Sequence, residues 1–180
     1  MSIPHPRKQL LSLLLSAGHE TTVNLIGSGT LVLLEHPDQL ARLRDDPQVI
    51  KPAIEELLRF VCPAEMATER YAREDITIAG ITIPRGELVL AVLGSANRDP
   101  AYFADPDALD LTRANNKHLS FGQDIHYCMG APLSRLEGQI ALSTLVGRFP
   151  HLRLSIPSEQ VQWKSGFILR GLEALPVSLS

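Results

Sequence analysis

The apolar residues of this 180-residue chain recur with two different spacings, and each spacing predicts one kind of element. One long, nearly all-apolar run and three shorter amphipathic segments have the spacing of helices. They predict helices over Arg7–Leu34, Asp38–Leu43, Pro52–Phe60 and Ala131–Phe149. Because the first of these is apolar on nearly every face, we expect it to be buried.

Alternating isoleucines on both sides of Ala79-Gly80 predict a hairpin with a two-residue turn. We expect strands over Ile76–Ile78, Ile81–Ile83, Leu88–Leu93, Leu152–Ile156 and Leu175–Leu179. Between Ala96 and Ser120 the chain is rich in Asp, Asn and Pro, which predicts a long irregular meander. The sequence thus indicates a mainly α-helical α+β fold, and we interpret residues 1–180 as one domain.

Cys128 follows a glycine-bearing stretch and comes directly before the helix expected from Ala131. The dipole of a helix favours negative charge at its N-terminus, so a cysteine at this point can hold an anionic sulfur against a metal. A small, buried apolar side chain is the alternative interpretation of a lone cysteine.

Two further motifs lie in the expected helices. In Ala17–Thr22, Gly18 allows another molecule to approach the backbone, and Thr21 can donate to a carbonyl one turn earlier. Glu56 and Arg59 form an i,i+3 pair on one helix face. Without other information, a kink in a core helix also explains the first motif. A solvated surface pair also explains the second.

Together and in this order, these stretches resemble the cytochromes P450. The segment Phe121–Gly130 is similar to the haem-ligating pattern F-G-x-G-x-H/R-x-C-x-G, but Asp124 stands where the family has its second glycine. That glycine suggests left-handed backbone, which Asp tolerates better than most residues. The segment Ala17–Thr21 resembles the A-G-x-D/E-T motif, Glu56 and Arg59 resemble the E-x-x-R pair, and Ala96–Pro100 reads A-N-R-D-P.

The resemblance runs from about Leu10 to Leu179 and implies the C-terminal portion only of a bacterial-type P450 fold. It implies a haem b cofactor with the Cys128 thiolate as the metal ligand, and Glu20 and Thr21 as the catalytic pair that delivers protons. It also implies a structural network of Glu56, Arg59 and Arg113. The residues that it assigns to cofactor binding are Ala17, Gly18, Arg70, His118, Phe121, Gly122, His126 and Gly130.

The implied reaction is monooxygenation, namely C–H hydroxylation or epoxidation of an apolar small molecule with O2 and two electrons. Since the chain has no flavin or iron–sulfur motif, the electrons are expected from a ferredoxin or flavodoxin-type donor. By the same resemblance, the substrate pocket receives Ala64, Met66, Ala67, Ile168 and Leu169.

Composition limits the other functions that this chain can have. The net charge of −3 and the pI near 6.1 argue against a nucleic-acid binder. The longest apolar stretch, Leu10–Leu34, is broken by polar residues and glycines, so it predicts protein core rather than a membrane span. No signal-peptide pattern is evident, and an unpaired Cys62 fits a reducing compartment, so we expect a cytoplasmic protein.

Two alternatives from other classes stay open. The first is a truncated, non-catalytic P450 remnant that binds haem weakly or not at all, because the family's N-terminal half has no counterpart here. The second is a Cys/His metal site formed by Cys128, His126 and His118. Zinc sites usually need four ligands at tight spacings, and the chain has no C-x-x-C pair.

Overall fold

A computed structural model describes residues 6–179 of the chain, and helices dominate it. The helices are α1 (Pro6–Glu35), α2 (Pro37–Asp45), α3 (Ile50–Val61), α4 (Leu93–Ala96) and α5 (Ala131–Arg148), with the 3-10 turns η1 (Pro47–Val49), η2 (Asp124–His126) and η3 (Ser158–Gln160). The strands are β1 (Arg70–Tyr71), β2 (Ile76–Ile78), β3 (Ile81–Ile83), β4 (Leu88–Val89), β5 (Arg153–Leu154) and β6 (Val177–Ser178). The mainly helical α+β character is confirmed.

The four helices expected from the hydrophobic spacing are confirmed to within a few residues, but several strands differ from expectation. The strand expected over Leu88–Leu93 contains only β4, and the chain then turns into α4. A short apolar run does not distinguish strand from helix by its spacing alone, which explains the difference. Strands β5 and β6 are also shorter than expected, and the sequence did not indicate β1.

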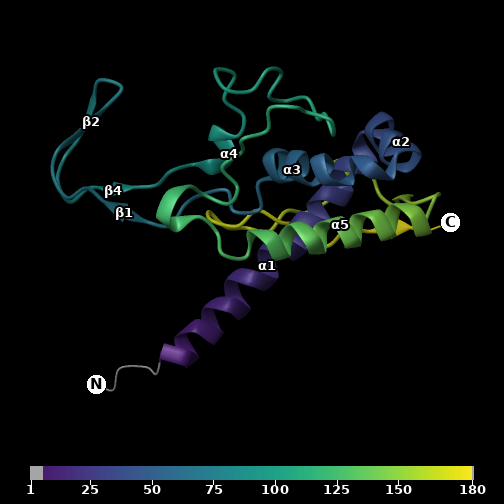
Figure 1. Cartoon of the computed structure of the whole chain (residues 1–180), viewed down its shortest axis with the longest axis horizontal. Helices are drawn as coiled ribbons and strands as arrows, with labels where there is room; N and C mark the ends of the chain where they lie inside the picture. Colours follow the sequence, from purple (N-terminus) through teal and green to yellow (C-terminus); the bar gives the residue numbers. More distant parts are fainter. Residues whose placement is uncertain (1–5, 180) are drawn as a thin grey trace.

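The strands described pair as three antiparallel ribbons, β1 with β4, β2 with β3, and β5 with β6. The β2–β3 hairpin projects from the helical body (Figure 1). Ala79 and Gly80 have φ angles of 50° and 81°. Positive φ at both central residues is the geometry of the type I′ turn, which suits the twist of a two-residue hairpin.

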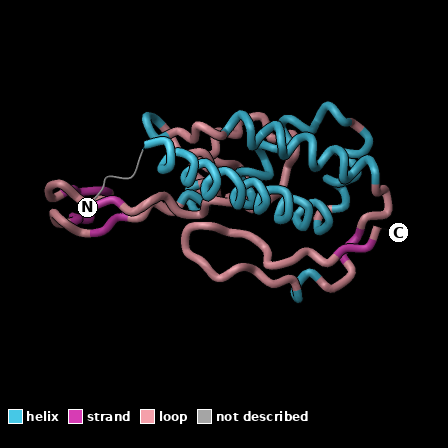
Figure 2. Tube along the Cα trace, turned by 90° about the horizontal axis from the view of Figure 1, so that it is seen from below, coloured by secondary structure: helices cyan, strands magenta, loops and turns pink. Residues whose placement is uncertain are grey.

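The core forms where α1, α3 and α5 pack together, and Figure 2 shows these helices gathered on one side of the C-terminal segment. Leu25, Ile54, Leu57 and Leu142 are completely buried there. Gly138 permits this close packing, since an added Cβ would lie 3.2 Å from methyl groups of Leu25 and Ile54. The result is that α3 is fixed between its neighbours and its polar side chains have defined directions.

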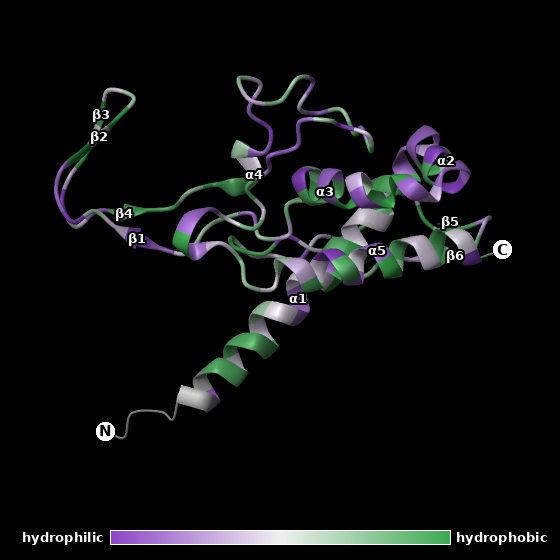
Figure 3. Ribbon diagram, viewed as in Figure 1, coloured by the Kyte–Doolittle hydropathy of each residue, from purple (hydrophilic) through white to green (hydrophobic). Residues whose placement is uncertain are grey.

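The N-terminal part of α1 departs from the expected burial. Its leucines are 49–67% exposed, and this part of the helix projects away from the body (Figures 1 and 3). The exposed side chains are Leu10, Leu11, Leu13, Leu14 and Leu15. The apolar pattern correctly indicates side chains that favour burial, but burial also needs a neighbouring segment. Although α1 is the most apolar stretch, no helix within residues 6–179 is long and apolar enough to cross a membrane.

The C-terminal segment is fitted closely against the middle of α1. Asn24 is almost fully buried there, and a Cβ added to Gly171 would overlap its side-chain amide. The contact fixes the stretch that includes Ile168 and Leu169. Glycine is therefore required at position 171 by close approach.

We expect Gly171→Ala to destabilise the chain by about 1–3 kcal/mol, because the added methyl group overpacks the contact with Asn24. The matched control is Gly147→Ala in α5, where an added Cβ meets nothing within 4 Å. That change should stabilise the helix by about 0.5–1 kcal/mol. Urea unfolding of both variants measures the effects, and equal stability of the two would contradict the packing argument.

Candidate functional site: the cysteine loop and its supports

The cysteine loop, residues Phe121–Gly130, leads directly into α5. The backbone N–H of Cys128 donates to the carbonyl of Phe121 at 2.9 Å and so closes the loop. The Cys128 carbonyl accepts from the N–H of Ala131 at 3.2 Å, and the Cys128 thiol is exposed. The loop therefore presents a thiol just before the positive end of the α5 dipole, where negative charge is favoured.

Asp124 has the left-handed backbone that its position in the motif predicted. Its φ angle is 57°, and that of the nearby Gly122 is 71°. Such backbone costs an L residue free energy that glycine does not lose. Asp124 is thus accommodated in the loop, but in a conformation that favours glycine.

Glu56 and Arg59, both on α3, form a completely buried ion pair. Nε and Nη2 of Arg59 donate to the two carboxylate oxygens of Glu56, each at 2.8 Å. Nε of Arg113 lies 3.1 Å from Oε2 of the same carboxylate. The structure therefore brings together the three residues that the resemblance assigned to a network, and two further donors come from Asn116 and the backbone of Asp110.

Arg59 uses all five of its N–H donors. Besides Glu56, it donates to the backbone carbonyls of Asn97, Pro106 and Ala108, at 2.9, 2.7 and 3.1 Å. Two charges are thus removed from water with every hydrogen-bonding group satisfied, which is the condition for a buried ion pair to be tolerated. The network ties α3 to the irregular meander.

Glu55, the residue before Glu56, points to a second set of partners. Arg135 of α5 donates to its two oxygens at 2.7 and 2.9 Å, and Nε2 of His118 lies 3.2 Å from Oε2. Partial burial raises the pKa of Glu55, but the hydrogen bonds from His118 and Arg135 outweigh that effect and lower the pKa to about 2. Glu55 is therefore an anion over the whole working range of pH.

The structure places His118, which the resemblance assigned to cofactor binding, beside Glu55. Its ring is almost completely buried, its Nε2 faces Glu55, and its Nδ1 accepts from the N–H of Ser120 at 3.2 Å. Both ring nitrogens are engaged inside the protein. By contrast, Arg70 in β1 and His126 at the end of η2 are exposed, and both can reach an external anion.

The Ala17–Thr22 motif runs along α1 beside the start of α5. Thr21 donates its hydroxyl to the Ala17 carbonyl at 2.8 Å, as the sequence predicted. Glu20 forms an exposed ion pair with Lys164 at 3.1 Å. Next to Gly18, a cleft of about 380 Å³ lies between the two helices. Its apolar walls are formed by Val23, Ile26, Ile140 and Ala141.

The residues expected in a substrate pocket come together from distant parts of the chain. Ala64 and Leu169 form an antiparallel bridge, and the N–H of Glu65 donates to the Ile168 carbonyl at 2.8 Å. Met66 bridges Val92 on the other side. Ala67 follows directly, and its N–H donates to the Ala91 carbonyl at 2.9 Å.

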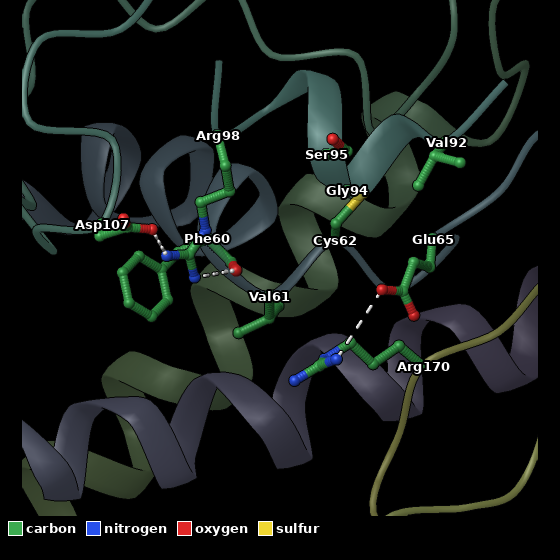
Figure 4. Close-up of a pocket in the computed structure, with 10 residues that line it drawn as sticks. All are labelled: Phe60, Val61, Cys62, Glu65, Val92, Gly94, Ser95, Arg98, Asp107 and Arg170. Carbon is green, nitrogen blue, oxygen red and sulfur yellow. Dashed lines mark hydrogen bonds and ion pairs between the residues drawn. The ribbon is translucent and has the colours of Figure 1, made fainter. Parts of the chain in front are cut away.

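Cys62 lies in a different environment from Cys128. It ends α3 and lines a cavity of about 330 Å³ with Phe60, Glu65, Arg98 and Arg170, where Arg98 reaches Asp107 and Arg170 reaches Glu65 (Figure 4). Burial raises the pKa of the Cys62 thiol to about 11, and hydrogen bonds from Ser120 and Asn97 only partly oppose this. Such a thiol is neutral and poorly reactive.

Sequence reasoning missed the residues that connect the supports to the loop. Asn97 is completely buried, donates to Ser120 Oγ at 2.9 Å and accepts from the N–H of Leu119 at 2.7 Å, just before the cysteine loop. Its place in Ala96–Pro100 was the one available signal. Arg135 had no signal, because a single arginine on an amphipathic helix usually indicates a solvated face.

The proposed Cys/His metal site has no geometric support in the structure. Within residues 6–179, no three His, Cys, Asp or Glu side chains converge as metal ligands would. His118 is turned toward Glu55, whereas Cys128 is exposed on the loop.

We expect iodoacetamide at pH 8 to label Cys128 quickly and Cys62 only after unfolding. Cys128 is exposed, while the raised pKa of Cys62 keeps its thiolate scarce until the pH approaches about 11. Peptide mass spectrometry before and after addition of urea measures each site. Equal labelling of the two cysteines in the folded chain would contradict the assignment of Cys62 as a closed, inert thiol.

Comparison with known proteins gives a consistent result. A family model for cytochrome P450 matches residues 5–170. The polyketide biosynthesis cytochrome P450 PksS of Bacillus subtilis is 50% identical over 171 residues, which cover 95% of this chain and 42% of that protein. The 6-deoxyerythronolide B hydroxylase of Saccharopolyspora erythraea is 52% identical over 92% of this chain and 41% of its own length.

The solved structure of Bacillus subtilis PksS superposes on this chain with a TM-score of 0.92. Identity is 50%, and the match covers 95% of this chain and 44% of that one. The chain therefore spans about two fifths of the length of the relatives that it matches. Its fold is the corresponding part of theirs.

Proposed function

Because the chain belongs to the cytochrome P450 family, we propose that it is the cysteine-bearing part of a haem-thiolate monooxygenase. The observation that carries the proposal is the exposed Cys128 thiol, held before α5 by a loop that the Cys128 N–H closes on the Phe121 carbonyl. The residues present fit haem b. Cys128 offers a soft anionic ligand, and Gly18 leaves open space, since a Cβ there would meet nothing within 4 Å.

In this proposal Cys128 Sγ ligates the iron, and Arg70 and His126 bind the propionates. Phe121, Gly122 and Gly130 shape the loop, and Ala17 and Gly18 face the cofactor from α1. When bound, haem b supplies the redox chemistry that places one oxygen atom of O2 into the substrate and releases the other as water. The electron donor is a ferredoxin or flavodoxin-type protein.

Proton supply is the task of Glu20 and Thr21. In this structure the Thr21 hydroxyl donates to the Ala17 carbonyl, which fixes the position of Oγ1 on α1. The Glu20 carboxylate is partly exposed and forms an ion pair with Lys164 at 3.1 Å, so it lies between solvent and α1. A shift of Thr21 Oγ1 away from its carbonyl acceptor would allow it to pass a proton inward.

The substrate is an apolar small molecule that undergoes C–H hydroxylation or epoxidation. Ala64, Met66, Ala67, Ile168 and Leu169 contribute one apolar wall, because the two segments that carry them are bridged. Two relatives support this class, since PksS belongs to polyketide biosynthesis and the other is a 6-deoxyerythronolide B hydroxylase.

The second candidate is a P450 remnant that binds haem weakly or not at all. The observation in its favour is the exposed apolar surface of α1, Leu10–Leu15, together with a length of only about two fifths of the relatives. The two candidates differ in one property, which is whether the chain holds haem through a thiolate.

We expect the haem-supplied, reduced chain to give the red-shifted carbon monoxide band of a thiolate-ligated haem. Cys128→Ala should abolish the band, because it removes the ligand, and Cys62→Ala should keep it, because Cys62 is buried in a separate cavity. A difference spectrum of each variant measures this. Absence of the band in the unmodified chain favours the remnant, and its loss in Cys62→Ala alone would refute the ligand assignment.

We also expect Asp124→Gly to raise the fraction of chain that retains haem. Glycine relieves left-handed strain of about 1 kcal/mol and removes a carboxylate from the loop that holds the anionic ligand. The control is Asp105→Gly, which relieves a similar φ of 46° in the meander. Haem-to-protein ratios after gel filtration measure the effect. The same ratio for all three chains would show that Asp124 carries no penalty.

A further inference from the structure

Arg135, in the second turn of α5, contacts the cysteine loop at two points. Its Nη1 donates to the Tyr127 hydroxyl at 3.0 Å, and its guanidinium lies over the Phe121 ring, 4.6 Å from the centroid. Phe121 begins the loop, and Tyr127 directly precedes Cys128. One side chain therefore contacts the first residue of the cysteine loop and the residue directly before the thiol.

The guanidinium is itself held from the opposite side. Its Nε and Nη2 bind the two oxygens of Glu55 as a planar fork at 2.7 and 2.9 Å. Glu55 lies on α3, the helix fixed in the core, and His118 supports its second oxygen. The bidentate geometry sets the plane of the guanidinium and hence the face that it turns to Phe121.

The Phe121 ring connects these contacts with the backbone of Cys128. It packs between Arg135, the His118 ring at 5.9 Å and the Tyr127 ring at 6.3 Å. The backbone carbonyl of Phe121 accepts the hydrogen bond from the Cys128 N–H that closes the loop. A displaced Phe121 would move that carbonyl and so release the closing bond.

Arg135 combines an ion pair with a hydrogen bond and a ring contact, which is more than a surface ion pair makes. A surface ion pair would need neither a fixed carboxylate nor a stacked ring. We propose that Arg135, oriented by Glu55, is a positioning residue that fixes Phe121 and Tyr127 and thereby sets the place of Cys128. This rests on the proposed function only for its consequence at the haem, because the contacts belong to the chain itself.

Hydrogen exchange of the full 180-residue chain without haem tests the proposal directly. We expect Arg135→Ala to speed exchange of the Cys128 amide about tenfold relative to the unmodified chain, because its closing bond opens more often. The Leu142 amide, in the core part of α5, reports the global stability. Arg135→Lys should resemble Arg135→Ala, since an ammonium lacks the planar fork.

The matched control is Arg148→Ala at the end of the same helix, where the guanidinium lies near the Phe149 ring at 5.9 Å. It should leave exchange at Cys128 unchanged. If Arg135→Ala speeds exchange at Cys128 and Leu142 by the same factor, Arg135 is only a general stabiliser and the proposal is wrong. Unchanged exchange at Cys128 also refutes it.

The haem-supplied chain gives an independent result. Arg135→Ala should lower the share of bound haem that shows the thiolate-type carbon monoxide band, and Arg148→Ala should not. If the unmodified chain shows no such band, the monooxygenase proposal fails, while selective exchange at Cys128 still supports positioning. If the band is present and the Cys128 amide does not respond, the positioning proposal alone fails.

Discussion

The buried carboxylate of Glu56 is the constraint around which the rest of this structure is arranged. An anion with no exposed surface is tolerated only if strong donors surround it, and Arg59, Arg113 and Asn116 supply them. These donors come from α3 and from the meander, so the meander must fold back on the helix. The irregular path between α4 and the cysteine loop is therefore fixed by these charged contacts together with the burial of Phe103, Leu109 and Leu111.

The two consecutive carboxylates of α3, Glu55 and Glu56, bind different parts of the chain. Glu56 faces the meander, while Glu55 faces α5 and the cysteine loop. Neighbouring residues on a helix point about 100° apart, so one helix can support two loops at once. The core packing of Ile54 and Leu57 fixes α3. The positions of the meander and of the cysteine loop therefore both depend on this one helix.

The exposed leucines of α1 and the open cleft beside Gly18 have the same physical origin. Both include apolar side chains that stay exposed in the part of the chain that the structure describes, among them Val23 and Ile140 in the cleft. The relatives are more than twice as long as the matched region, and the chain follows their fold closely over the part that it shares. Packing inside this part is nevertheless complete enough to place α1, α3 and α5 together.

The sequence by itself determined the helices, the hairpin and the identity of the cysteine loop. Those features depend on local spacing, turn chemistry and a motif of contiguous residues, as the positive φ angles of Ala79 and Asp124 illustrate. Only the tertiary structure decided that His118 contacts Glu55 and that the Arg135 guanidinium lies over the Phe121 ring. Such contacts join residues 63 and 14 positions apart, and no local pattern records which partner a long polar side chain will meet. The burial expected for α1 was wrong for its N-terminal part, because an apolar pattern indicates a preference that only neighbouring segments can satisfy.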